Sequence, residues 1–155
     1  MTVSFTGHRD ACSKELRRVL RQELEDLIIQ GTDTFCAGGA AGFDTLAAET
    51  VIGLREEYPW IMLRLVLPCP PEEQTGRFTE DLRRQYYDIL RAADLTETVS
   101  PHYDPECMKR RNQRLIDLAD VCVCFYDRRR YASGTGQTVR MAEKRGIDII
   151  NIFTK

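Results

Sequence analysis

The stretch VCVCFYDRRRYASGTGQTVRMAEKRGIDIINIF (residues 121–153) decides the fold class of this chain. It begins with a continuous apolar run at 121–126, typical of a buried strand, which ends at Asp127 and three arginines. A helix is predicted at 136–145 and a last strand at 148–153. Strands separated by helices in this way are typical of a parallel sheet. Three cations and two glycines at the end of a buried strand fit two interpretations: an anionic ligand resting on a helix start, or a plain turn beside solvated charges.

The same alternation runs through the rest of the chain. Strands are predicted at 2–6, 34–37, 61–67 and 96–99. Helices are predicted from the cap at Ser13 to the stop at Gly31, and at 43–57, 73–93 and 105–119. The strands are nearly continuous apolar runs, which favours a sheet covered on both faces. We therefore expect an α/β fold, a three-layer doubly wound Rossmann-like sandwich with a mostly parallel sheet.

Length and composition limit the classes of function. The 155 residues show no repeat and no linker, so a single domain over 1–155 is expected. The formal charge of −2 argues against a general binder of nucleic acid or anionic membranes, although a local basic patch stays open. No apolar run approaches the roughly 20 residues of a membrane span, and no signal peptide is evident. A cytoplasmic protein without a membrane partner is the simplest interpretation.

The cysteines and histidines do not predict a metal site. Six cysteines form no CxxC pair, and the two histidines stand at no metal-ligand spacing from them. No metal and no cofactor are therefore predicted. Cys36, Cys122 and Cys124 lie in apolar strand-like runs, where free cysteine behaves as a small hydrophobe. Cys12 and Cys107 lie in more polar surroundings, and their reactivity stays open.

Glycine-rich loops follow three of the predicted strands. They are TGHRD (6–10), AGGAAGFDTLAAE (37–49) and DRRRYASGTGQT (127–138). In doubly wound folds, ligands bind outside the carboxyl ends of the strands, where the strand order reverses. Free backbone amides and helix N-termini at that edge bind phosphate or carboxylate. Each motif alone is commonplace, and only the three together predict an anion-binding site.

Several side chains near these loops are candidates for direct roles. Arg9 follows Gly7 closely, and His8 between them is either a ligand-binding or a merely hydrogen-bonded histidine. Arg111 and Asn112 stand at the basic start of helix 105–119, which lies near the ligand edge of the sheet. Asp44 could cap its own helix, bind a ribose hydroxyl or act as a carboxylate in glycosidic chemistry. These roles of Asp44 are not exclusive.

The segments FTGHRD, GGAAGFDTLAAE, RRNQRLIDLADVCVCFYD and SGTGQTVRMAEKRGI together resemble the YpsA-like branch of the SLOG superfamily. That superfamily joins the DNA-processing protein DprA (Smf) with the LOG phosphoribohydrolases, which activate cytokinins. The resemblance implies a Rossmannoid fold and a site for a nucleotide or a nucleotide-derived ligand. Together with His8, the ligand-binding residues carried over by position are Gly7, Arg9, Gly38, Gly39, Asp44, Arg111, Asn112, Ser133, Gly134, Thr135, Gly136 and Thr138.

One departure from the LOG pattern concerns catalysis. The phosphoribohydrolases carry a PGGxGTxxE motif whose glutamate serves N-glycosidic cleavage. When its glycines are matched to Gly134 and Gly136, Gln137 replaces the threonine and Arg140 replaces the glutamate. The next acid, Glu143, is almost a full helical turn further on. We therefore expect that the phosphate-binding loop is kept and the catalytic acid is lost, unless Asp44 substitutes for it.

Three functions follow, in this order. The first is binding of a nucleotide or nucleotide derivative, in which case the protein would serve as a sensor or regulatory module. The second is an enzyme, a nucleoside 5′-monophosphate phosphoribohydrolase or related N-glycosidic transferase, with Asp44 as its catalytic residue. The third is single-stranded DNA binding as in DprA, ranked last because the chain is acidic overall, so a nucleic-acid partner is not expected. The resemblance also leaves a homodimer open.

Overall fold

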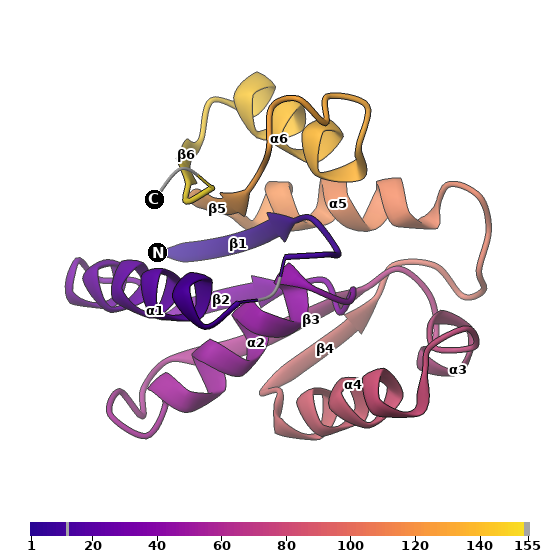
Figure 1. Ribbon diagram of the computed structural model, residues 1–155, viewed down its shortest axis with the longest axis horizontal. Coiled ribbons are helices and arrows are strands. Elements are labelled where there is room, and N and C mark those ends of the chain that lie inside the picture. The colour runs from indigo at the N-terminus through magenta and orange to yellow at the C-terminus, as the bar shows by residue number, and fades with distance from the viewer. Residues whose placement is uncertain (12, 154–155) are drawn as a thin grey trace.

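Six parallel strands form one sheet at the centre of the molecule. The computed structural model describes residues 1–11 and 13–153 (Figure 1). The strand order is β4-β3-β2-β1-β5-β6, and every neighbouring pair is parallel. The predicted doubly wound α/β fold is thereby confirmed, with a sheet that is parallel throughout. The strands are β1 (Thr2–Gly7), β2 (Thr34–Ala37), β3 (Met62–Leu67), β4 (Leu95–Thr98), β5 (Val121–Phe125) and β6 (Asp148–Asn151).

Helices cover both faces of the sheet (Figure 1). On one face lie α1 (Lys14–Ile29), α2 (Phe43–Leu54) and α4 (Glu80–Ala92), and on the other lie α5 (Cys107–Leu118) and α6 (Gly134–Arg145). The four-residue helix α3 (Pro71–Gln74) stands between β3 and α4. The chain first winds outward from β1 to β4, then returns through α5 to β5 on the other side of β1. The strand order therefore reverses between β1 and β5.

A column of phenylalanine rings supports the edge where the order reverses. The ring of Phe5 lies 6.0 Å from Phe35 and 6.3 Å from Phe43, and Phe43 lies 6.1 Å from Phe125, all between ring centroids. Phe43 is the first residue of α2, so this column fixes the start of that helix beneath the loop after β1. Gly7 is required here, because a Cβ at this position would lie 2.4 Å from the Phe43 ring. Removing such a ring from a core typically costs 3–5 kcal/mol.

The helix predicted at 73–93 is instead two helices, and the prediction was wrong at this point. Helix α3 ends at Gln74, and α4 begins after Thr79, whose hydroxyl accepts a hydrogen bond from the Leu82 N–H at 3.3 Å. The Arg83 guanidinium donates to the carbonyl groups of Thr75 and Phe78, which the break leaves without helical partners. The interruption creates a loop that protrudes at the carboxyl edge of the sheet.

Helix α6 begins two residues earlier than predicted. The Ser133 hydroxyl accepts a hydrogen bond from the Gly136 N–H at 3.0 Å, so Ser133 is the N-cap and Gly134 the first helical residue. The expected cap of α1 is confirmed, since the Ser13 hydroxyl accepts from the Leu16 N–H at 3.0 Å. All three residues of the GTG turn are therefore part of the helix itself.

The cysteines within the described ranges are buried and free. Burial raises the pKa of Cys36 to about 11 and that of Cys124 to about 12, which agrees with structural thiols. Cys107 is also fully buried, so its thiol is closed to solvent. Cys12 lies outside the described residues. Among the helices that the structure describes, none is long and apolar enough to cross a membrane.

Candidate ligand-binding site

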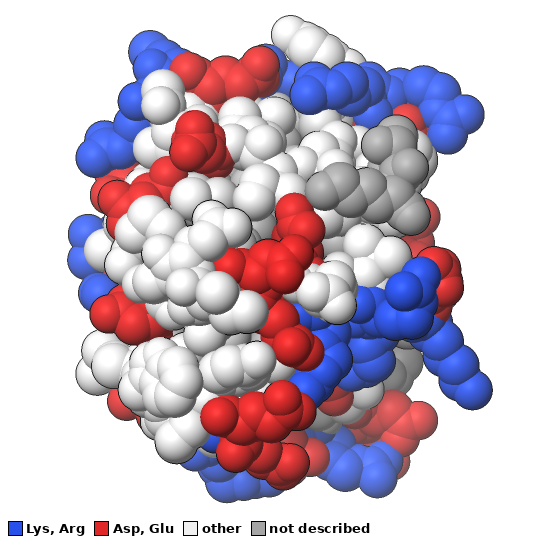
Figure 2. Space-filling view, turned by 90° about the vertical axis from the view of Figure 1, so that its left-hand side faces the viewer, with Lys and Arg blue, Asp and Glu red and all other residues white. Residues whose placement is uncertain are grey.

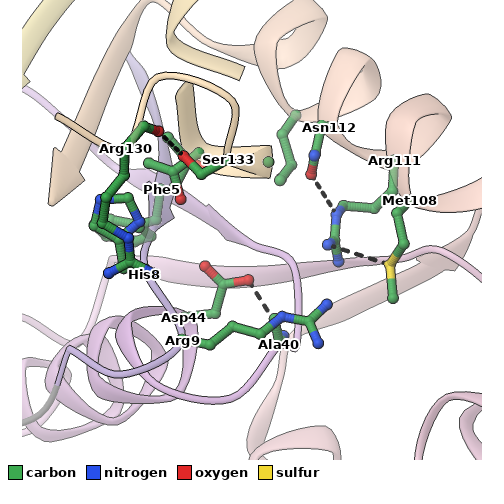
Figure 3. Close-up of a pocket in the computed structure, with 15 residues that line it drawn as sticks. Phe5, His8, Arg9, Ala40, Asp44, Met108, Arg111, Asn112, Arg130 and Ser133 are labelled. Atoms are coloured by element: carbon green, nitrogen blue, oxygen red, sulfur yellow. Dashed lines mark hydrogen bonds between the residues drawn. The ribbon is translucent and has the colours of Figure 1, made fainter. Parts of the chain in front are cut away.

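A hollow of about 260 Å³ opens at the carboxyl ends of β1 and β5, where the strand order reverses (Figure 3). We call it the central hollow. Its wall includes the loop after β1, the loop before α2, one side of α5 from Met108 to Leu115, and the start of α6. Residues predicted from the sequence that line it are Gly7, His8, Arg9, Asp44, Arg111, Asn112, Ser133, Gly134 and Thr135. Gly38, Gly39, Gly136 and Thr138 are not part of its lining.

The start of α6 offers free backbone donors to the central hollow. The Ser133 side chain and carbonyl accept from the N–H groups of Gly136 and Gln137. The N–H groups of Gly134 and Thr135 have no acceptor among the residues that the structure describes. Such unpaired donors at a helix N-terminus, with the helix dipole behind them, attract negative charge.

The two glycines of the GTG turn have different roles. A Cβ on Gly136 would lie 2.5 Å from the Tyr131 carbonyl oxygen, so this glycine is required by packing. A Cβ on Gly134 would meet no atom within 4 Å, so packing does not require glycine there. Thr138 is fully buried and donates its hydroxyl hydrogen to the Gly134 carbonyl at 2.9 Å, within the helix. Among these residues, Gly134 is the one at the hollow whose identity packing leaves unexplained.

Arg111 brings a buried cation to the opposite wall (Figure 3). Its side chain is 4% exposed and donates to the Gly38 carbonyl, to Asn112 Oδ1 at 2.9 Å and to the Met108 sulfur at 3.7 Å. Burial lowers the pKa of Arg111, and the nearby Asp44 opposes that effect. A Cβ on Gly38 would lie 2.6 Å from Arg111 Nη1, so Gly38 makes room for the cation and holds it through its carbonyl.

Asp44 is the one carboxylate in the lining of the central hollow. Asp44 does not cap α2, because the N-cap position of that helix is held by Gly42, which has no side chain. Asp44 is instead the second helical residue, and its Oδ2 accepts from the Ala40 N–H at 3.2 Å, which closes the loop before the helix. Burial raises the pKa of Asp44, against the opposing charge of Arg111. The carboxyl group therefore takes up a proton more readily than an ordinary aspartate.

His8 connects two loops of the wall. Its ring is 3% exposed, and its Nε2 accepts a hydrogen bond at 2.9 Å from the Asp127 N–H. Burial lowers the pKa of His8, and the charge of Arg130 lowers it further. The lone pair of Nε2 is used inside the protein, so the imidazole shapes the hollow and does not offer that nitrogen to a ligand.

The arginines near the hollow have distinct partners. Arg130 lines the hollow and pairs with Asp10 at 2.9 Å. Arg129 pairs with Asp127, and Arg128 lies over the Tyr126 ring, 5.5 Å from its centroid; neither lines the hollow. Arg9 makes no hydrogen bond or ion pair with any described residue, and its side chain extends toward Met108 across the floor of the view in Figure 3. Of these cations, Arg9 is the free one.

The position that holds glutamate in the LOG motif does not reach the hollow. Arg140 donates to the Tyr131 carbonyl at 2.9 Å, and its guanidinium lies 4.0 Å from the centroid of the Tyr131 ring. Glu143 is exposed and is not part of the lining. Any acid chemistry in the central hollow would therefore fall to Asp44.

Some residues that line the central hollow were not predicted from the sequence. Ala40 and Met108 line the central hollow, and both also line a second hollow of about 670 Å³ beside it. The second hollow reaches the loop between α3 and α4, which the predicted continuous helix concealed. Gly76 together with the capping residue Thr79 was the signal in the sequence that could have revealed this loop.

Comparison with known proteins identifies the family and its curated relatives. The family model YpsA, described as the YspA SLOG family, matches residues 3–153. A UPF0398 protein of Halalkalibacterium halodurans is 31% identical over 72% of this chain and 59% of its own length. A UPF0398 protein of Bacillus thuringiensis is 30% identical over 84% of this chain and 71% of its own length. The chain thus spans about three fifths to seven tenths of these curated relatives.

A solved structure shows the same fold. DNA processing protein A from Helicobacter pylori, studied for its single-stranded DNA binding mode, superposes with a TM-score of 0.66 at 19% sequence identity. The match covers 96% of this chain and 63% of that one. At this level of identity the likeness concerns the fold.

Proposed function

The chain belongs to the YpsA family of SLOG proteins, and we propose that it binds a nucleotide or a nucleotide-derived small molecule in the central hollow. The observation that carries the proposal is the convergence of unlike groups at one point of strand reversal. Two free amides at the start of α6, the buried Arg111, the free Arg9 and the Asp44 carboxylate all border one hollow of about 260 Å³. A solvated charge run would not require a buried arginine.

The phosphate is assigned to the amides of Gly134 and Thr135 with the guanidinium of Arg9. A helix N-terminus and a cation acting together are a common phosphate site. Arg111 already donates to Gly38 and Asn112, so it contributes mainly a fixed positive potential. The carboxylate of Asp44 can accept hydrogen bonds from ribose hydroxyls, which a site for inorganic phosphate alone would not need. A sensor or regulatory role follows if binding occurs without turnover.

Calorimetric titration tests this function directly. Ribose 5-phosphate and the nucleoside 5′-monophosphates should bind the native protein, and Arg9→Gln should weaken binding about tenfold or more because a charge-assisted hydrogen bond is lost. Arg129→Gln is the matched control, since Arg129 lies on the same edge but does not line the hollow. Absence of binding to all of these ligands at millimolar concentration would refute the proposal.

Single-stranded nucleic acid is a second candidate ligand. A groove of about 620 Å³ between α5 and α6 is lined by Lys109, Arg140, Lys144 and Arg145, with no carboxylate in its lining. The DNA binding studied for the similar Helicobacter pylori protein supports this candidate. An oligothymidylate should then bind in fluorescence anisotropy with an affinity that falls steeply as salt increases. Lys144→Glu should weaken that binding, make it less dependent on salt and leave mononucleotide binding unchanged.

A further inference from the structure

The second hollow adjoins the central hollow and differs from it in chemistry. We call it the flanking hollow, of about 670 Å³; Arg9, Ala40 and Met108 line both hollows. One ligand can therefore extend from the first to the second across these shared residues. The flanking hollow also has the aromatic side chains of Phe78 and Tyr103 in its wall, whereas the lining of the central hollow is dominated by charged and small residues.

The aromatic wall is held in place on two sides. Phe78 packs edge-on against Tyr86, with ring centroids 5.9 Å apart, and the Tyr86 hydroxyl donates to Gln74 Oε1 at 2.8 Å. These contacts fix the loop between α3 and α4. Tyr103 comes from the loop between β4 and α5, and its N–H donates to Glu73 Oε1 at 3.0 Å. The loop before α5 is thereby joined to helix α3 beside the flanking hollow.

The two hollows also differ in the charge of the residues that line them. Arg9, Arg111 and Arg130 line the central hollow with Asp44 as its one carboxylate, and the start of α6 adds positive potential. The flanking hollow has Glu72 and Glu73 in its lining, opposite Arg77 and the shared Arg9. A phosphate group is therefore drawn to the central hollow, and the uncharged part of the same ligand to the flanking one.

From this arrangement we propose that the flanking hollow binds the base of the nucleotide whose phosphate and ribose occupy the central hollow, against the aromatic faces of Phe78 and Tyr103. The proposal rests on the proposed function and deepens it, because it names a nucleotide with its base attached as the ligand. Every base can stack on an aromatic face, so the four bases should bind with similar affinity. A ligand without a base should bind more weakly than any of them.

The experiment compares ligands with and without the base on the native protein and on three variants. Calorimetric titration of the native chain with ribose 5-phosphate and with each nucleoside 5′-monophosphate gives the contribution of the base. Tyr103→Ala removes an aromatic side chain that is 59% exposed, and Trp60→Ala, at 60% exposure and outside both hollows, is its matched control. Phe78→Leu keeps an apolar side chain that packs on Tyr86 but removes the ring face.

We expect the monophosphates to bind more tightly than ribose 5-phosphate by roughly 5- to 150-fold, the range of base–aromatic stacking. Tyr103→Ala and Phe78→Leu should reduce that advantage and leave the affinity for ribose 5-phosphate unchanged, while Trp60→Ala should change neither. Equal affinity for ligands with and without a base, or native nucleotide affinity in both aromatic variants, overturns the inference but spares the proposed function. Absence of binding by every ligand, ribose 5-phosphate included, overturns both.

Discussion

The Nε2 atom of His8 accepts a hydrogen bond from the backbone N–H of Asp127 at 2.9 Å, and this bond joins the loop after β1 to the loop after β5. Only the neutral imidazole can accept it. Burial and the charge of Arg130 lower the pKa of His8 in the folded protein, although Asp10 and Asp127 oppose the shift. The two loops form adjoining walls of the central hollow, so the protonation of one ring affects both folding and the shape of the site.

Stability should therefore fall as the pH drops from 7 through 6.5 toward 5. The unfolded chain takes up a proton at the ordinary histidine pKa before the folded protein does, with a slope of at most about 1.4 kcal/mol per pH unit. The variant His8→Gln keeps a hydrogen-bond acceptor but does not titrate. Its melting temperature should therefore fall less over this pH range than that of the native protein. His102→Gln, at an exposed histidine, is the control. Identical pH profiles for native protein and His8→Gln would contradict the assignment.

Alanine substitutions at the two glycines of the GTG turn should have opposite effects on stability. Gly136→Ala should lower the unfolding free energy by about 1–3 kcal/mol, because its methyl group clashes with the Tyr131 carbonyl. Gly134→Ala meets no neighbour and needs no positive φ, so it should raise the unfolding free energy by about 0.4–1 kcal/mol by restricting the unfolded chain. Urea unfolding measures both values.

Ligand binding separates the role of Gly134 from packing. Its added methyl group lies at the wall of the central hollow, where a phosphate would approach the helix start. Gly134→Ala should therefore weaken ribose 5-phosphate binding in calorimetry while the protein becomes no less stable. Native affinity in this variant would show that the ligand does not approach these amides closely.

Removing one member of the buried Asp44 and Arg111 pair should be costly. Both side chains are almost fully buried, and each counteracts the effect of burial on the other. Arg111→Met should lower the unfolding free energy by about 3 kcal/mol, because the buried Asp44 carboxylate loses the larger of the two positive charges that offset its burial, and only Arg9 remains. Adding Asp44→Asn to Arg111→Met should restore part of that loss in urea unfolding. Strict additivity of the two substitutions would mean that the charges do not interact.

Substitution of Asp44 also tests whether the protein hydrolyses a nucleotide. The raised pKa of Asp44 would allow the carboxyl group to give its proton to the departing base as the bond from the ribose C1′ to the base breaks. Water would then attack C1′ and lose a proton to the Asp44 carboxylate, which restores the acid. If the protein is a phosphoribohydrolase, chromatography will detect free base from a nucleoside monophosphate, and Asp44→Asn will reduce its release by orders of magnitude. If it only binds, the monophosphate will remain intact through long incubation with the native protein.

The fold could be predicted because its signals are local. Apolar runs such as 121–125 and the capping sequence at Ser13 specify strands and helix starts from neighbouring residues alone. The break between α3 and α4 was missed because the charged and apolar residues on either side of it keep helical spacing across the loop. The loop is stabilised by contacts from a distance, such as that of Arg83 with the Thr75 and Phe78 carbonyls.

The sequence predicted most of the residues that line the central hollow, but not the role of each. Glycines at strand ends mark the edge where a ligand binds, but sequence cannot tell a glycine that makes room for a ligand from one that makes room for the protein. Gly38 is of the second kind, because Arg111 fills the space beside it. His8 likewise has its partner, Asp127, far away in the sequence. Tyr103 and Phe78 come to the same hollow only through tertiary structure, so no local pattern indicates that they share it.

The position of Trp60 has a practical consequence for optical measurements. It is the only tryptophan of the sequence and precedes β3, whose six residues span about 20 Å to the edge where both hollows open. Its intrinsic fluorescence should therefore change little when a small molecule binds. Moving the indole to the flanking hollow, as in a Trp60→Phe and Tyr103→Trp double variant, would convert the same emission into a direct reporter of occupancy.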